Sequence, residues 1–350
     1  MKHLFWNKVT NKALLWKEWR QNRWKFLGAL IIMSFTPIIN TVQYWLMPSS
    51  YGSSEVYWSQ GILRILVYGS ENSIEFWGMF VALGLGALML GQERESHALE
   101  FIAAAPFSRR QIIVTKFILG TMVIVGIMLI NALFMILAAS LLPALYTVGM
   151  VIKWFLLTTV TLLVIFSFTL MLSTVTGNVL AAGGISLLFL FLPMLLQGMV
   201  VGVFRSLGFI GANSGIENLS EVIAKYVTIP RYLEYPAGFY PPEVGRLLYQ
   251  KTLPPDYWGI VSVLLLAIVL FLVLAVFLFE RNPLEKRGEI LMFGNFKRIL
   301  QVSLAILTAW MGASIVIQYH ASSGIFVGSF LVILVGTYFL VNLVYRVQRN

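Results

Sequence analysis

The sequence predicts an all-α, polytopic membrane protein with about eight transmembrane helices and an N-terminal interfacial amphipathic helix. Of its 350 residues, 59% are hydrophobic and only 11% are charged, and the mean hydropathy is +0.83. The charged residues gather between long uncharged runs, a distribution typical of proteins whose main solvent is the bilayer. There is no cysteine, so disulfide bonds and thiolate chemistry are excluded.

Eight apolar stretches are long enough to cross a membrane, because a spanning helix needs roughly 20 residues. They lie at about residues 26–47, 74–92, 112–142, 154–176, 179–204, 258–279, 299–319 and 325–345. The third stretch is longer than one crossing requires, so we expect part of it to tilt or to extend beyond the lipid. The first stretch and its basic leader are both longer than a signal peptide prefers, which predicts a retained helix.

The positions of Lys and Arg predict that both termini lie in the cytoplasm. With this topology the inner segments hold 18 of the 25 basic residues, and these segments are residues 1–25, 92–117, 280–298 and 346–350. Most of the other seven lie in the long segment 202–257, where the positive-inside rule has little force. The net charge of +10 then fits anionic lipid headgroups better than nucleic acid.

Residues 1–25 form a basic cytoplasmic segment before the first span. The part from residue 11 to residue 26 distributes aromatic and basic side chains around one helix, which predicts a helix lying flat on the inner leaflet. Its interfacial residues are predicted to be Trp16, Trp19, Arg20 and Arg23. The alternative is a positively charged flank that sets the topology and has no further role.

Three further segments lie outside the spans. Segment 202–257 is predicted to lie on the outer side, and it contains six of the 12 prolines, which favours a small cap in which Ser220 starts one short helix. Residues 26–279 then form a six-span domain. A charged cytoplasmic connector at 280–298 precedes residues 299–350, which supply two additional spans and a short cytoplasmic tail.

The sequence carries no motif for catalysis, for a cofactor or for a metal. The phosphate-binding pattern GxxxxGK[ST] and the zinc pattern HExxH do not occur. The three histidines, His3, His97 and His320, are too scattered to suggest a metal site. We therefore predict a protein that is not an enzyme and that has no catalytic residues and no cofactor or metal of its own.

The polar residues of the predicted spans are mostly uncharged, whereas Glu75, Lys116 and Glu280 lie near the predicted helix ends. Proton-coupled carriers use charged groups inside the membrane, so this pattern disfavours them. Hydrogen bonds between helices explain most buried amides and hydroxyls. A substrate path is the alternative role for four amides, Asn40, Gln43, Asn131 and Gln197.

Residues 91–117, GQERESHALEFIAAAPFSRRQIIVTKF, join the second and third spans. The apolar run ends abruptly in Glu93, Arg94 and Glu95, Pro106 interrupts the segment, and Ser108 can cap the next helix. This composition predicts a rigid, charged projection into the cytosol.

The segment resembles the inner loop of ABC-2-type permeases, which reads approximately E-[RK]-E-x-G-T-[LM]-E-x-L-x-x-x-P-x-[ST]-R. His97 and Ala98 stand where that pattern has Gly-Thr. The resemblance implies that residues 93–110 act as a coupling loop seated in a groove of a cytosolic ATPase. The coupling residues that it implies are Glu93, Arg94, Glu95, Leu99, Glu100, Phe101, Pro106, Ser108 and Arg109.

The resemblance also implies a transport activity and partner proteins. Such a permease moves a substrate across the cytoplasmic membrane, with ATP and Mg bound by a separate ATPase chain, and it pairs with a second permease subunit that is identical or related. The last two spans resemble those of an eight-span bacterial subgroup described as acetoin-type or envelope-stress permeases. The competing hypotheses are an ion-coupled secondary carrier, a non-transporting membrane scaffold or sensor that binds an ATPase, and an intramembrane enzyme.

Overall fold

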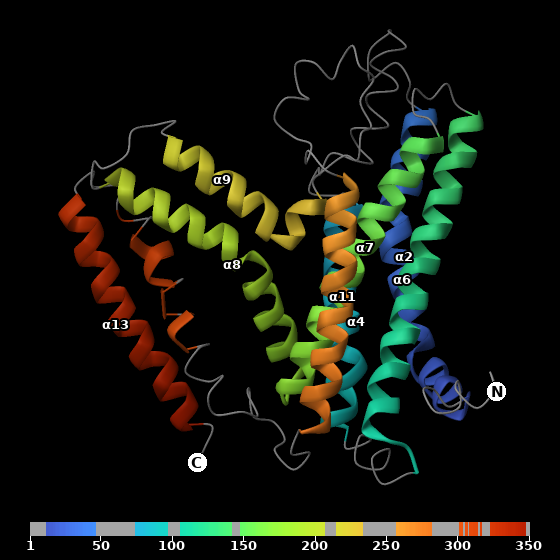
Figure 1. The fold of residues 1–350 in the computed structure, drawn as a ribbon, viewed down its shortest axis with the longest axis horizontal. Coiled ribbons are helices and arrows are strands. Elements are labelled where there is room, and N and C mark those ends of the chain that lie inside the picture. The colour runs from blue at the N-terminus through green and yellow to red at the C-terminus, as the bar shows by residue number, and fades with distance from the viewer. Residues whose placement is uncertain are drawn as a thin grey trace.

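Figure 1 shows the computed structural model of the chain as a bundle of long helices. It describes residues 12–46, 74–96, 106–141, 148–206, 215–233, 257–281 and 323–347, together with most of 301–316. Every regular element within these ranges is a helix, which confirms the all-α prediction. The elements are α2 (Lys12–Leu46), α4 (Ile74–Glu95), α6 (Arg109–Leu141), α7 (Val148–Val175), α8 (Val179–Ser206), α9 (Gly215–Val227), the 3₁₀ helix η2 (Ile229–Leu233), α11 (Tyr257–Glu280) and α13 (Ser323–Val347).

The described helices include five that are long and apolar enough to cross a membrane, so the chain is a polytopic membrane protein. Each coincides with a predicted span. α2 and α4 contain most of two further predicted spans, 26–47 and 74–92. The predicted span 299–319 lies partly outside the described residues, and its described part forms the shorter apolar helix Gln301–Ala313. The five long apolar helices are Arg109–Ala138, Val151–Val175, Val179–Gly202, Tyr257–Glu280 and Gly324–Leu343.

α7 is the central helix of the bundle and packs against α4, α6, α8 and α11. Its sequence is apolar on nearly every side, which is typical of a helix surrounded by other helices. In its most apolar stretch 83% of the residues are buried, compared with 6% in α13. Val164, Ile165 and Phe166 of α7 are fully buried. The core of the molecule therefore lies around α7, while α13 has most of its apolar surface exposed.

α4 approaches α7 closely at Gly86. A Cβ atom placed there would lie 2.8 Å from the Cβ of Thr169 and 2.9 Å from the backbone oxygen of Phe166. Small residues permit helix backbones to come this near, and a backbone atom cannot move aside as a flexible side chain can. At Gly84, on the same helix, an added Cβ would meet nothing within 4 Å.

The variant Gly86→Val is expected to lower the free energy of unfolding by about 1–3 kcal/mol, because the added methyl groups force α4 away from α7. Gly84→Val is the matched control, since it makes the same chemical change on the same helix in open space. Thermal unfolding of both purified variants in detergent measures the difference. Equal destabilisation by the two variants would show that helix propensity, and not the close approach, controls stability.

α8 changes direction along its length (Figure 1), and Pro193 lies inside it. A proline removes one backbone hydrogen bond and clashes with the preceding turn, which bends a helix. The part of α8 beyond the bend runs beside α9, and the two helices pack against each other.

The predicted start of the short outer helix is wrong, because α9 begins at Gly215 and not at Ser220. Apolar residues lie on both sides of Ser220, for example Leu219 and Val222, so the helical pattern extends before the serine and a cap at Ser220 does not set its start. The hydroxyl of Ser220 instead accepts a hydrogen bond of 3.4 Å from Gln197 Nε2 of α8.

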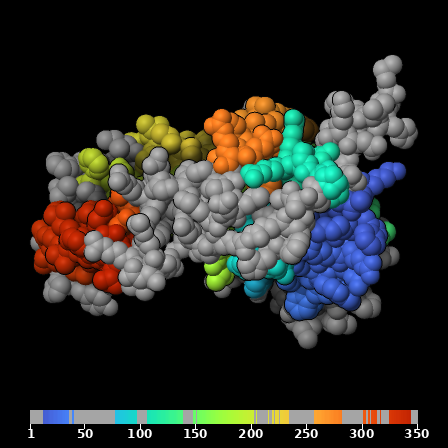
Figure 2. All heavy atoms as spheres, turned by 90° about the horizontal axis from the view of Figure 1, so that it is seen from below, coloured from blue at the N-terminus to red at the C-terminus, as the bar shows by residue number. Residues whose placement is uncertain are grey.

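One end of the bundle gathers most of the functional candidates. α2 and α6 begin there, and α4, α7 and α11 end there (Figure 1). Figure 2 looks at this end, where the first residues of α2, the start of α6 and the end of α11 lie close together and α13 lies at the opposite side of the molecule.

Candidate functional site

Four charged side chains from three helices meet at this end of the bundle. The Nζ atom of Lys116 on α6 lies 2.9 Å from both carboxylate oxygens of Glu18 on α2. The same Nζ lies 2.7 Å from Oε2 of Glu93 on α4. Lys17 Nζ lies 2.9 Å from Glu18 Oε1 and also pairs with Glu93. We call these four residues the charge cluster.

Burial makes the charge cluster sensitive to the loss of any partner. The side chains of Lys116 and Glu18 are fully buried, that of Glu93 is 2% exposed, and that of Lys17 is 32% exposed. Two ammonium groups balance two carboxylates, so the cluster buries no net charge. An unpaired buried charge costs several kcal/mol, and the cluster therefore favours the arrangement of α2, α4 and α6 that keeps all four partners together.

Arg94 follows Glu93 and reaches the C-terminal end of α7. Its guanidinium donates to the backbone oxygens of Ser173 at 2.9 Å, Thr174 at 3.1 Å and Thr176. The last carbonyl groups of a helix lack partners within the helix and carry a partial negative charge. Arg94 is 6% exposed, so it supplies a buried cation to these oxygens and ties α4 to α7.

Glu95 and Arg109 make comparable contacts with two other helices. Glu95 Oε1 accepts a hydrogen bond of 3.0 Å from the backbone nitrogen of Val179, in the first turn of α8. Arg109 Nη1 donates to the backbone oxygen of Glu280 at 3.2 Å, in the last turn of α11. Both contacts agree with the helix dipole, which attracts an anion to the first turn and a cation to the last.

Ser108 caps α6, as the sequence predicts. The backbone nitrogen of Gln111 donates to Ser108 Oγ at 3.2 Å, and the backbone nitrogen of Ser108 donates to Gln111 Oε1 at 3.0 Å. These reciprocal bonds form a capping box, which fixes where the chain enters α6.

The contacts described above lie on both sides of residues 97–105. On one side, Glu93, Arg94 and Glu95 connect the end of α4 with α2, α6, α7 and α8. On the other side, Arg109 connects the start of α6 with α11. Polar contacts, buried at Glu93 and Arg94 and exposed at Glu95 and Arg109, thus attach both sides of this segment to the helices of the bundle. We call Glu93, Arg94, Glu95 and Arg109, together with the rest of the charge cluster, the junction.

A family model described as "ABC-2 family transporter protein" matches residues 12–284, a range that runs from the start of α2 past the end of α11. The chain belongs to this family. It is thus an ABC-2-type permease, a class of protein that lacks the ATPase domain. The match confirms the resemblance inferred from residues 91–117.

Two curated permeases are similar to parts of this ABC-2-type chain. It is 32% identical over 126 residues to the probable ABC transporter permease YtrC of Bacillus subtilis (strain 168), covering 36% of this chain and 37% of that protein. It is 26% identical over 137 residues to the probable ABC transporter permease YtrD of the same strain, covering 38% of this chain and 41% of that protein. The chain therefore spans about two-fifths of the length of these relatives.

The predicted coupling residues of this ABC-2 permease have different environments. Glu93 and Arg94 are buried, and their contacts lie within the permease. Glu95, Pro106 and Ser108 are exposed, and Arg109 is half-buried. The remaining three, Leu99, Glu100 and Phe101, lie outside the described residues.

The predicted interfacial residues Trp16, Trp19, Arg20 and Arg23 are all exposed on α2. Trp16 is 62% exposed, and the guanidinium of Arg20 lies 5.1 Å from its ring centroid. α2 runs without a break from this segment into the first predicted span. The buried residues of this part of α2 recur at every fourth position, and they are Leu14, Glu18, Asn22 and Phe26.

The amides considered for a substrate path have different partners. Asn131 is buried, and its Nδ2 donates to Ser34 Oγ of α2 at 3.2 Å and to a backbone oxygen of its own helix. Gln197 of α8 donates to α9. The side chains of Asn40 and Gln43 lie outside the described part of the chain. The observed amides thus make contacts between helices.

The charge cluster was not predicted from the sequence. In the sequence Lys116 lies near the end of a predicted span, but in the structure its side chain is fully buried. Glu18 is an acidic residue within the basic segment 1–25. The available signal was the four-residue spacing from Leu14 through Glu18 and Asn22 to Phe26, which puts an acid and an amide on an otherwise apolar helix face.

The charge cluster is suited to holding helices together rather than to binding a metal. Within the part of the chain that the structure describes, no group of three or more His, Cys, Asp or Glu side chains could hold a metal ion. Both carboxylates of the cluster are already paired with lysines.

Proposed function

We propose that this permease moves its substrate across the cytoplasmic membrane with energy from a separate ATPase chain that docks on the loop 93–110. The observation that carries the proposal is the junction, which links both ends of segment 97–105 to the helices of the bundle. A docking loop must be firmly attached to the helices that it moves, and these contacts provide that attachment.

The loop divides into two parts with different roles. Leu99, Glu100 and Phe101 in the middle supply the surface for the ATPase, with an apolar contact and a carboxylate for basic residues of the partner. Glu93 and Arg94 act inside the permease, because they are buried and contact α6 and α7. The exposed residues Pro106 and Ser108 belong to the docking side.

Two contacts connect the loop to α7, the central helix of the bundle. Arg94 joins the end of α4 to the end of α7, and α4 then runs along α7 with a close approach at Gly86. Packed helices move as rigid bodies between discrete arrangements, so displacement of the loop tilts α4 and α7 together.

We place both termini and the loop in the cytoplasm, on the distribution of Lys and Arg. The start of α2, with its exposed Trp16 and Trp19, lies at the cytoplasmic surface of the membrane. The permease pairs with a second permease subunit, identical or related, so that two membrane chains match two ATPase sites. Similarity to two different permeases of one organism is compatible with either pairing.

The double variant Leu99→Ala with Glu100→Ala tests the docking surface. We expect loss of most of the ATPase activity that the permease stimulates, because the central apolar and charged contacts of an interface dominate its binding energy, with about 2 kcal/mol or more for each hot-spot residue. The measurement is ATP hydrolysis by the reconstituted complex, together with the amount of ATPase that co-purifies with the permease.

The matched control is the pair Leu219→Ala and Val222→Ala, two exposed residues of α9, which should leave both readings unchanged. Full stimulation of the ATPase by the Leu99 and Glu100 variant would contradict the docking site. Transport that proceeds without any nucleotide, driven by an ion gradient, would instead support a secondary carrier.

A further inference from the structure

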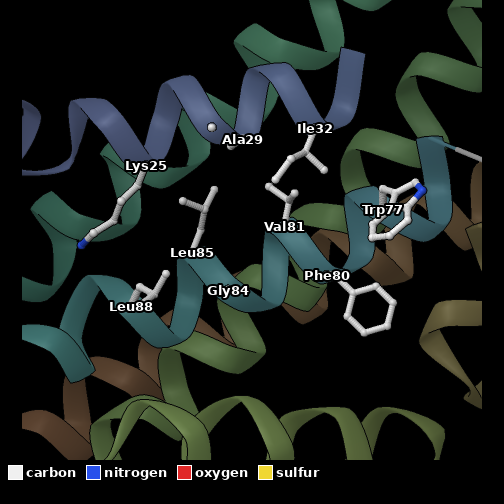
Figure 3. A pocket seen from close by; sticks show the side chains of 10 residues that line it. Lys25, Ala29, Ile32, Trp77, Phe80, Val81, Gly84, Leu85 and Leu88 are labelled. Carbon is white, nitrogen blue, oxygen red and sulfur yellow. The ribbon is translucent and has the colours of Figure 1, made fainter. Parts of the chain in front are cut away.

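An apolar groove runs between α2 and α4, and its volume is about 400 Å³. Figure 3 shows Val81 and Leu85 of α4 facing Ala29 and Ile32 of α2, with Lys25 at one end of the row and Trp77 at the other. Ile32 is 46% exposed and Trp77 is 40% exposed. The groove is therefore open to the surroundings of the bundle along apolar walls.

Two glycines keep the groove open. A Cβ atom added at Gly28 of α2 or at Gly84 of α4 would meet nothing within 4 Å, and both residues line the groove. An apolar side chain at either position would fill the groove without displacing its walls. The two helices thus leave room here for apolar material that is absent from their own sequences.

Lys25 is the charged residue of the groove lining. It forms no ion pair with a carboxylate among the described residues, and the charges of Glu18 and Glu93 that act on it are opposed by those of Lys17 and Lys116. Lys25 Nζ donates to Asn22 Oδ1 at 2.7 Å. The nearby charge cluster contributes no net charge, because its two lysines balance its two glutamates. The end of the groove therefore presents an ammonium group that attracts an anion.

The length of the groove matches one leaflet. Trp77 and Leu88 mark its extent on α4, and a rise of 1.5 Å per residue makes this distance about 16 Å. The hydrocarbon core of a bilayer is about 30 Å thick. One acyl chain of a phospholipid extends through about half of that thickness, so the groove is long enough to hold one.

We propose that this groove binds one acyl chain of an anionic phospholipid whose phosphate contacts Lys25. The apolar walls receive the chain, and the ammonium group at the junction end receives the headgroup. The site lies beside the charge cluster on the same two helices, so the bound lipid adds to the contact between α2 and α4. This inference requires that α2 and α4 cross the membrane, and it does not depend on the ATPase.

The test uses the purified full-length chain in phosphatidylcholine vesicles that contain a small amount of phosphatidylglycerol with a photoreactive acyl chain. Mass spectrometry then locates the labelled residues. We expect labelling of α2 and α4 along the groove, about fivefold stronger than with an equally photoreactive phosphatidylcholine, because a basic residue near the surface contributes about 1 kcal/mol toward an anionic lipid.

Paired variants separate the groove from general lipid contact. Gly84→Leu should abolish labelling of the groove, and Gly28→Leu provides an independent second variant. Gly126→Leu on α6 is the control, since its added side chain also starts in open space but outside the groove. Lys25→Gln should reduce the labelling by phosphatidylglycerol to that by phosphatidylcholine, and Lys25→Arg should preserve the preference.

Three results would overturn the proposal. The first is equal labelling of the native groove by the two lipids, and the second is groove labelling that persists in Gly84→Leu and Gly28→Leu. The third is crosslinking of Trp77 or Phe80 to a second copy of the chain in place of lipid, which would make this groove a permease–permease interface.

Discussion

Replacing Lys116 with methionine is expected to lower the free energy of unfolding by about 3–5 kcal/mol. Methionine retains much of the apolar stem but removes the ammonium group that contacts Glu18 at 2.9 Å and Glu93 at 2.7 Å. Two buried carboxylates then share the single ammonium of Lys17, which is partly exposed. The repulsion between them and the loss of pairing both act at the contact of α2, α4 and α6.

A second substitution should recover much of the lost stability. Adding Glu18→Gln to Lys116→Met restores the balance, because Glu93 still pairs with Lys17. Unfolding in mixed micelles for the two single variants and the double variant gives their interaction energy, which we expect to exceed about 1 kcal/mol. Lys12→Met, which removes an exposed lysine of α2 outside the charge cluster, should cost less than about 1 kcal/mol. Additive losses in the double variant would contradict the charge cluster as a coupled unit.

The long helices were predictable because each membrane crossing is formed by one uninterrupted run of apolar residues. The bounds of α11, Tyr257–Glu280, differ little from the predicted span 258–279. The start of α6 was also predictable, since the cap at Ser108 depends on Gln111 in the next turn. These features depend on residues that are adjacent in the sequence, so the sequence alone could indicate them.

The charge cluster depends on contacts between distant segments. Lys116 and Glu18 are separated by 98 positions in the sequence, and neither residue alone shows that its side chain is buried. Likewise, the sequence of α4 shows Arg94 directly after an apolar run, but not that the C-terminal oxygens of α7 receive it. The family resemblance drew attention to residues 93–110, and only the arrangement of the helices separates the buried residues of this segment from the exposed ones.

Replacing Arg94 with methionine is expected to cost about 2–4 kcal/mol of stability, because a hydrogen bond to a charged group contributes about 1.5–3 kcal/mol and the buried carbonyl groups lose their partner. Ser173, Thr174 and Thr176 are the residues whose backbone oxygens are affected. Arg94→Lys should recover only part of the lost stability. It keeps the positive charge, but one ammonium group cannot reproduce the several spaced N–H donors of the planar guanidinium.

The same Arg94→Met variant distinguishes anchoring from docking. If Arg94 passes force from the loop to α7, the purified complex should retain its ATPase chain and bind nucleotide, while substrate-linked ATP hydrolysis falls. Lys153→Met is the control, because it removes an exposed cation at the other end of α7, outside the junction. Loss of the bound ATPase chain in a folded Arg94→Met permease would mean that the guanidinium acts at the docking surface, and that its bonds to α7 are secondary.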